Sequence, residues 1–237
     1  MLDRLRELRL DKGKLPKHIG IVIGGNQLWA EEEGVEKDVA FRKSFTHLMD
    51  SLDMCIQLNI PILTVHLLSE KMRDSPEFPD FMNTLIEFLD KLHDSKMIHT
   101  NQVKISIFGK WYKLPDRMVN SIKSVLNKTA GYDKLFLNLC INYDGQDEIV
   151  DACRLIGKQI SMGRIDPDLV NRQTIKENLY TASFLPVGLL IVTGPYKSNE
   201  GFLLWDTKHA AIYFAKKNWL EFQRQDFFEA LRFHQRA

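Results

Sequence analysis

Short apolar runs alternate with amphipathic stretches along most of this chain. The apolar runs predict buried strands over 18–25, 61–68, 103–109, 134–142, 187–194 and 210–215. Between and after them, apolar residues recur at helical spacing, which predicts helices over 38–60, 76–93, 114–129, 144–163 and 224–237. This alternation predicts an α/β protein with a central parallel β-sheet of about six strands, flanked by helices.

The predicted helix over 76–93 carries an unusually wide apolar stripe. Its members are Phe78, Phe81, Met82, Leu85, Phe88, Leu89 and Leu92. Such a stripe is typical of plain core packing, and it also suits the wall of a cavity for a long hydrocarbon. The sequence leaves both interpretations open.

No linker or repeat interrupts the pattern, so we expect one domain over 1–237, in which residues 1–16 form an N-terminal amphipathic helix and its lead-in. Leu2, Leu5 and Leu8 are spaced along one face of that helix. We expect the helix to pack on the domain or on a partner. Peripheral contact with a membrane surface is the open alternative.

Composition narrows the setting of the protein but not its activity. The chain is 44% apolar and 27% charged, and its net charge of +1 gives no reason to expect nucleic acid as a partner. Cys55, Cys140 and Cys153 show no disulfide or metal spacing, and no apolar run is long enough to span a membrane. These features predict a cytoplasmic globular protein.

Candidate chemistry gathers where the predicted strands end, because ligands of parallel sheets bind at the carboxyl ends of the strands. The stretch IVIGGNQLWA (21–30) leads a strand into Gly24, Gly25 and Asn26. Bare backbone N–H groups at such a turn suit a phosphate. The stretch nevertheless contains no carboxylate for a metal and no cation for the phosphate.

Five segments in order resemble the cis-prenyltransferases of the undecaprenyl diphosphate synthase type. They are LPKHIGIVIGGNQLWA, LNIPILTVHLLS, LNLCINYDGQDEIVDACR, GLLIVTG and FLLWDTKHAAIYF. The resemblance covers almost the whole chain. It implies a parallel sheet with flanking helices, a long hydrophobic tunnel and a dimer.

The same resemblance places the family's catalytic groups on residues that cannot replace them. The metal-binding aspartate falls on Gly24 and the metal-binding glutamate on Ala211. Arginines or a histidine of the family fall on Leu28, Phe41, Val192 and Ser198. We therefore expect no catalytic residue and no metal ligand in this chain.

Other residues at family positions could still bind a diphosphate. The residual set comprises Gly25, Asn26, Lys37, Arg42 and Ser69. Lysine keeps the charge of an arginine but not its bidentate geometry.

These substitutions favour a non-catalytic subunit of a heteromeric cis-prenyltransferase that makes polyprenyl diphosphate. A catalytic homologue would carry Mg²⁺, and isoprenoid diphosphates would be bound through the complex. We expect the interface in the segment 202–222. One alternative is an active atypical synthase that uses Asp206, Lys197, Lys208 and His209. Another is a stand-alone module that binds isoprenoid diphosphates.

Overall fold

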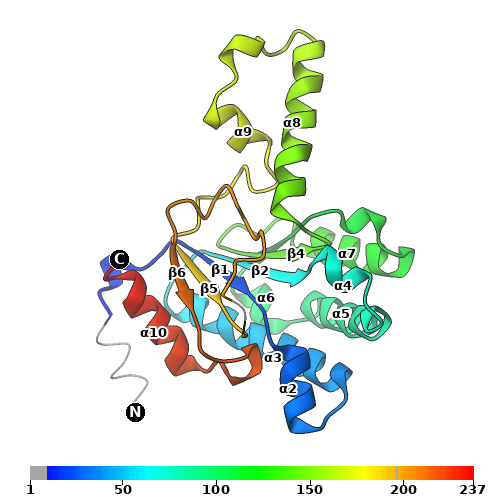
Figure 1. The fold of residues 1–237 in the computed structure, drawn as a ribbon, viewed down its shortest axis with the longest axis vertical. Helices are drawn as coiled ribbons and strands as arrows, with labels where there is room; N and C mark the ends of the chain where they lie inside the picture. Colours follow the sequence, from blue (N-terminus) through cyan, green and yellow to red (C-terminus); the bar gives the residue numbers. More distant parts are fainter. Residues whose placement is uncertain (1–9, 196) are drawn as a thin grey trace.

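A single six-stranded parallel sheet organises the protein (Figure 1). The computed structural model describes residues 10–195 and 197–237. The strands run in the order β3-β4-β2-β1-β5-β6. Their bounds are β1 His18–Val22, β2 Ile62–Leu68, β3 Val103–Phe108, β4 Leu135–Ile141, β5 Leu189–Val192 and β6 Ala211–Phe214. The predicted parallel α/β sheet of six strands, flanked by helices, is confirmed.

The larger core lies on one face of this sheet, beneath four helices. These are α3 Lys37–Gln57, α5 Phe78–His93, α7 Asp116–Thr129 and α10 Arg224–His234. Leu189 and Ile191 of β5 belong to this core, whereas Leu190 and Val192 belong to a second core on the other face. Because successive side chains of a strand point to opposite faces, one apolar run supplies both cores.

The second core is smaller and is closed partly by irregular segments. Val187, Phe202 and Leu203 are buried there, and Tyr180 and Phe184 pack against them. The chain between β5 and β6 therefore returns across this face of the sheet. Three large aromatic side chains of the segment 202–222 are inside the protein, because Phe202, Trp219 and Phe222 are at most 1% exposed.

An arm formed by α8 Gly145–Ser161 and α9 Arg172–Asn178 projects away from the sheet (Figure 1). Buried residues of α8 recur as Glu148, Ala152 and Ile156, so one face of the helix is covered. Leu155 and Met162 remain exposed along the arm. The arm thus offers apolar surface that the chain itself does not bury.

The remaining elements are short. They comprise the helices α2 Asn26–Glu33, α4 Glu70–Arg73 and α6 Lys96–Thr100, and the 3₁₀ turns η1 Lys12–Lys14, η2 Trp111–Lys113, η3 Pro167–Leu169 and η4 Trp219–Glu221. Most of the helix predicted from Leu2, Leu5 and Leu8 falls on residues 1–9, outside the described residues. Among the described residues, no helix combines the length and the apolar character needed to cross a bilayer.

A buried polar cluster ties three central strands together. His18 Nε2 lies 2.7 Å from Thr64 Oγ1, and Asn138 Nδ2 donates to the same oxygen at 3.0 Å. Burial lowers the pKa of His18 from 6.5 to about 4. His66, stacked on Phe202 with ring centroids 5.2 Å apart, is also buried, and its pKa is lowered to about 4 for the same reason. Both imidazoles are therefore neutral in the folded protein at pH 7.

We predict that acid destabilises the protein through these two histidines. As the pH falls from 6.5 towards 4, the unfolded chain binds protons that the folded chain does not. The contribution of these two neutral imidazoles to the free energy of unfolding is therefore full above pH 6.5 and declines below it. Each imidazole contributes up to about 3 kcal/mol to this decline. The free energy of unfolding, measured in urea at several pH values, should therefore fall less steeply in His66→Phe.

The exposed His209 supplies the matched control, because His209→Asn removes an imidazole that is not buried. We expect this variant to keep the wild-type pH profile. A His66→Phe profile parallel to that of the wild type would contradict the assignment.

Candidate functional site

The ends of β1 and β5 meet at the edge of the sheet where the sequence placed its candidate chemistry. Gly24 N–H donates to Thr193 Oγ1 at 3.0 Å, and Thr193 Oγ1 donates to the carbonyl oxygen of Val22 at 3.1 Å. The threonine hydroxyl therefore joins the two strands just beyond their last ladder pairs. This role for Thr193 could not be read from the sequence, because it depends on which strands are neighbours.

Gly24 has no room for a side chain. A Cβ built on it would lie 2.4 Å from the carbonyl oxygen of Thr193. Gly194, at φ +92°, closes the same gap, since its own Cβ would lie 2.7 Å from the carbonyl carbon of Gly24. Restoring an aspartate at position 24 would require the backbones of these two segments to separate.

A third segment, residues 217–219, binds both strand ends through backbone hydrogen bonds. Trp219 N–H donates to the carbonyl oxygen of Gly24 at 2.9 Å, and Gly194 N–H donates to that of Lys217 at 2.8 Å. Asn218, between them, caps η4 together with Glu221. A Cβ on Gly25, at φ +84°, would lie 2.1 Å from Asn218 Oδ1. The spacing Asn-x-x-Glu is a capping-box pattern, so the sequence held a signal for this turn.

A cavity of about 380 Å³ opens beside the N-terminus of α2. Gly25, Asn26 and Gln27 line it on the helix side, and Phe41 and Phe81 form part of its apolar wall. The first N–H groups of a helix have no partner within the helix and attract anions. Asn26 Nδ2 donates to Ser44 Oγ at 3.0 Å, while the buried Asn26 Oδ1 has no partner within the described residues.

Of the predicted diphosphate-binding residues, Gly25 and Asn26 lie at this cavity, and the other three make contacts elsewhere. Lys37 Nζ lies 2.5 Å from Glu77 Oε1, and this hydrogen bond raises the pKa of Lys37 and lowers that of Glu77. Ser69 caps α4 by accepting from Met72 N–H at 3.4 Å. Their polar groups are thus already engaged within the chain.

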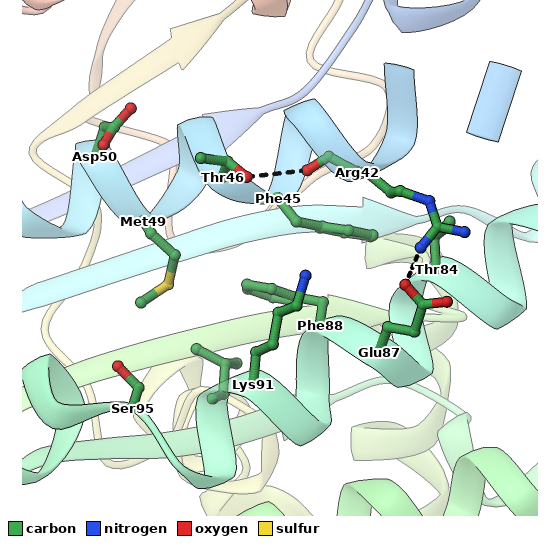
Figure 2. A pocket seen from close by; sticks show the side chains of 11 residues that line it. Arg42, Phe45, Thr46, Met49, Asp50, Thr84, Glu87, Phe88, Lys91 and Ser95 are labelled. Carbon is green, nitrogen blue, oxygen red and sulfur yellow. Dashed lines mark hydrogen bonds and ion pairs between the residues drawn. The ribbon is translucent and has the colours of Figure 1, made fainter. Parts of the chain in front are cut away.

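Arg42 lies at a second cavity, of about 310 Å³, between α3 and α5 (Figure 2). Its guanidinium pairs with Glu87 of α5, and Lys91 extends over the same opening (Figure 2). Below this charged rim, Phe45 and Phe88 are stacked with ring centroids 4.6 Å apart. The arginine therefore joins two helices at the rim of an apolar cavity.

A row of phenylalanines stands between the two cavities. Phe41 meets Phe81 edge to face at 5.1 Å between ring centroids, and Phe81 lies 5.9 Å from Phe45. Phe81 lines the first cavity, and Phe88 lines the second. The apolar stripe of α5 thus packs in the buried core and also lines two cavities. A wall for a long hydrocarbon stays a prediction.

The positions on which the resemblance places the family's metal ligands do not fit a divalent cation. Gly24 and Ala211 offer no carboxylate, and hard cations need oxygen ligands. Val192 is buried in the second core, and Ser198 Oγ accepts from Glu200 N–H at 3.1 Å. Within residues 10–195 and 197–237, no three His, Cys, Asp or Glu side chains gather closely enough to hold a metal ion.

The resemblance places a family histidine on Phe41 and a family arginine on Leu28, and these two apolar side chains differ in their exposure. Phe41 is buried in the larger core, where it supports α3, whereas Leu28 is 38% exposed on α2. Neither can donate a hydrogen bond from its side chain to a phosphate. The cavity beside α2 therefore has backbone N–H groups, the amides of Asn26 and Gln27 and the carboxylate of Glu31, but no side-chain cation among its lining residues.

The fold is that of the cis-prenyltransferases. The crystal structure of lavandulyl diphosphate synthase from Lavandula x intermedia, in complex with dimethylallyl diphosphate, matches with a TM-score of 0.90 at 23% identity, over 95% of this chain and 97% of that one. A probable undecaprenyl diphosphate synthase from Campylobacter jejuni matches with a TM-score of 0.76 at 23% identity, over 94% of this chain and 96% of that one.

Sequence comparison gives the family. The family described as "Putative undecaprenyl diphosphate synthase" matches residues 22–237. The chain is 31% identical to the tritrans,polycis-undecaprenyl-diphosphate synthase (geranylgeranyl-diphosphate specific) of Methanopyrus kandleri, over 98% of this chain and 86% of that protein. It is 29% identical to an isoprenyl transferase of Heliobacterium mobile, over 94% and 86% of the two chains. The chain belongs to the undecaprenyl diphosphate synthase family of cis-prenyltransferases.

We predict that Gly24→Asp destabilises the protein and confers no prenyl transfer. The new side chain meets the Thr193 carbonyl, so the two strand ends must separate at a cost of about 2 kcal/mol or more. Urea unfolding measures the loss. Gly131→Asp is the control, because a Cβ at Gly131 meets nothing within 4 Å. Equal stability of the two variants would show that the segments at Gly24 and Thr193 can separate at little cost in free energy.

Proposed function

We propose that this chain is the non-catalytic subunit of a heteromeric cis-prenyltransferase that makes polyprenyl diphosphate. The closed contact at Gly24 carries the proposal. A mere Gly-for-Asp replacement would leave an empty position, but here the Thr193 carbonyl oxygen lies 2.4 Å from the place where a Cβ on Gly24 would stand. The chain has reorganised this position as a structural contact, and the chemistry is left to a second protein.

The local charges support the same division of labour. The cation of Lys37 is paired with Glu77, and that of Arg42 with Glu87. A departing diphosphate needs preorganised positive groups or a metal, each worth about 10²-fold in rate. At the strand ends of this chain, those groups are replaced or already paired. The catalytic homologue would supply Mg²⁺ and the groups that hold isopentenyl diphosphate.

The partner would contact surface that this chain leaves open. The arm formed by α8 and α9 presents exposed Leu155 and Met162, and β6 is the last strand of the sheet, with Phe214 36% exposed. An open sheet edge and exposed apolar residues are features of interaction surfaces. Because Phe202, Trp219 and Phe222 are buried, they are not open to a partner, and within the expected segment 202–222 we propose β6 as the contact, together with the arm.

The proposal predicts the behaviour of the purified chain with farnesyl diphosphate, labelled isopentenyl diphosphate and Mg²⁺. Alone, it should extend the chain at least about 10⁴-fold more slowly than when mixed with the catalytic homologue encoded in the same genome. The measurement is transfer of label into polyprenyl product. Chain growth by this protein alone, at the rate of the mixture, would establish an active atypical synthase instead.

Retained ligand binding is the second candidate function, and the cavity beside α2 favours it. Backbone N–H groups and an apolar wall suit an isoprenoid diphosphate, whereas Asn26 Oδ1 and the Glu31 carboxylate, which also lie at the cavity, are acceptors that cannot donate to its phosphate oxygens. The relatives named as synthases act on such compounds, and this cavity could bind one without turning it over. Under this candidate, the chain binds the ligand alone or within the heteromer.

Asn26→Asp tests the cavity without changing its shape. If farnesyl diphosphate binds there, the added negative charge should weaken binding about tenfold or more, because like charges face each other in a partly buried site. Isothermal titration calorimetry gives the affinity. Asn120→Asp, on the exposed face of α7, is the control. Equal affinities for the two variants would place the ligand elsewhere.

A further inference from the structure

A third cavity lies on the second face of the sheet, away from the ends of β1 and β5. It has a volume of about 530 Å³ and is bounded by α9 and by the turn that leads into β6. Trp205 and Leu204 contribute apolar walls, and Arg172, Lys208 and His209 contribute polar ones. None of Gly25, Asn26, Lys37, Arg42 and Ser69 lines it, so it is separate from the cavity beside α2. Asp206, Lys208 and His209 of the atypical-synthase alternative do line it.

The inner wall of this cavity is fixed by a buried ion pair. Lys176 Nζ of α9 lies 2.7 and 2.9 Å from the two carboxylate oxygens of Asp206. Thr181 Oγ1 donates to the same carboxylate at 2.5 Å. The side chains of Lys176 and Asp206 are only 15% and 2% exposed, and their charges cancel. Asp206, a replacement relative to the family pattern, therefore serves structure and not catalysis.

The rim keeps uncompensated positive charge. Arg172, Lys208 and His209 are exposed, and their side chains make no hydrogen bond or ion pair with another described residue. Because Asp206 is neutralised by Lys176, the cavity has a net charge of about +2 from its two unpaired cations. This positive charge attracts an occupant that carries carboxylates.

Apolar surface beside the cavity indicates an occupant larger than a free anion. Leu169 lies three residues before Arg172 and is 68% exposed, and Leu185 lies next to the lining residue Pro186 and is 52% exposed. The helix α9 belongs both to the cavity wall and to the arm, which carries exposed Leu155 and Met162. A phosphate ion would use the cations and leave this apolar surface bare, whereas a polypeptide would cover both.

We propose that this cavity receives an acidic segment of the partner subunit, with carboxylates at Arg172 and Lys208 and an apolar side chain against Trp205. The inference rests on the proposed function, because it names how the catalytic homologue is held. Charged groups at the rim of an interface set the association rate and the choice of partner. Helix α9, which lines the cavity and belongs to the arm, then positions the arm against the partner.

The test compares two charge-reversal variants in binding to the catalytic homologue from the same genome. Arg172→Glu with Lys208→Glu should weaken the complex about tenfold or more, with greater loss at low salt, because like charges now face each other. Lys123→Glu with Lys128→Glu makes the same charge change on the exposed face of α7 and should leave the affinity within about threefold. Sedimentation equilibrium gives both affinities, and circular dichroism confirms that the variants are folded.

A carbodiimide cross-link gives a direct readout, because it joins a lysine amine to a carboxylate in contact with it. We expect Lys208 to be coupled to an Asp or Glu of the homologue. If the homologue binds the wild type and both variants equally, the cavity is not the docking site, and the proposed function stands. If wild-type chain and homologue do not associate, both proposals fail. If millimolar inorganic phosphate binds at Arg172 and Lys208 and leaves the complex intact, the site is an anion site and this inference is wrong.

Discussion

The contact between Gly24 and Thr193 is the constraint on which the functional edge of this protein depends. Two parallel strands leave the sheet side by side, and a threonine hydroxyl, a glycine N–H and two carbonyls bring their ends into contact. The segment 217–219 then binds both ends through backbone hydrogen bonds. Because backbone atoms fill the space beside Gly24, the position can hold neither a carboxylate nor a metal bound through it. The same contact that packs the two strand ends together therefore also decides which side chains this position can carry.

Several cations of the molecule are paired with carboxylates of the same chain. Lys37, Arg42 and Lys176 each have a carboxylate partner supplied by a distant part of the chain. In an enzyme that stabilises a departing diphosphate, such cations would face the ligand and remain available to it. Here they join helices and turns to one another. The pairs are partly exposed in two of these cases, so they orient side chains more than they stabilise the fold.

The two faces of the sheet differ in how completely the chain covers them. The face under α3, α5, α7 and α10 holds the larger core and is covered by the chain itself. The other face has a smaller core, an ion pair at its border, a cationic cavity and the projecting arm. Substitutions at the strand ends leave the first face intact. The second face retains exposed apolar and charged groups that suit association with another subunit.

The sequence by itself determined the parallel sheet and the order of the elements along the chain, because periodicity depends only on local geometry and burial. The family followed from the resemblance of five segments, which is a matter of residue identity. The apolar runs around Ile19, Val65, Leu139 and Ile191 all became buried strands. It could also show that Gly24 and Ala211 lack carboxylates. Only the tertiary structure could decide that Gly24 is sterically closed, that Arg42 faces Glu87 across a cavity, and that Asp206 is neutralised by Lys176. Those facts depend on which distant segments become neighbours, and residue types along a chain do not encode such distances directly.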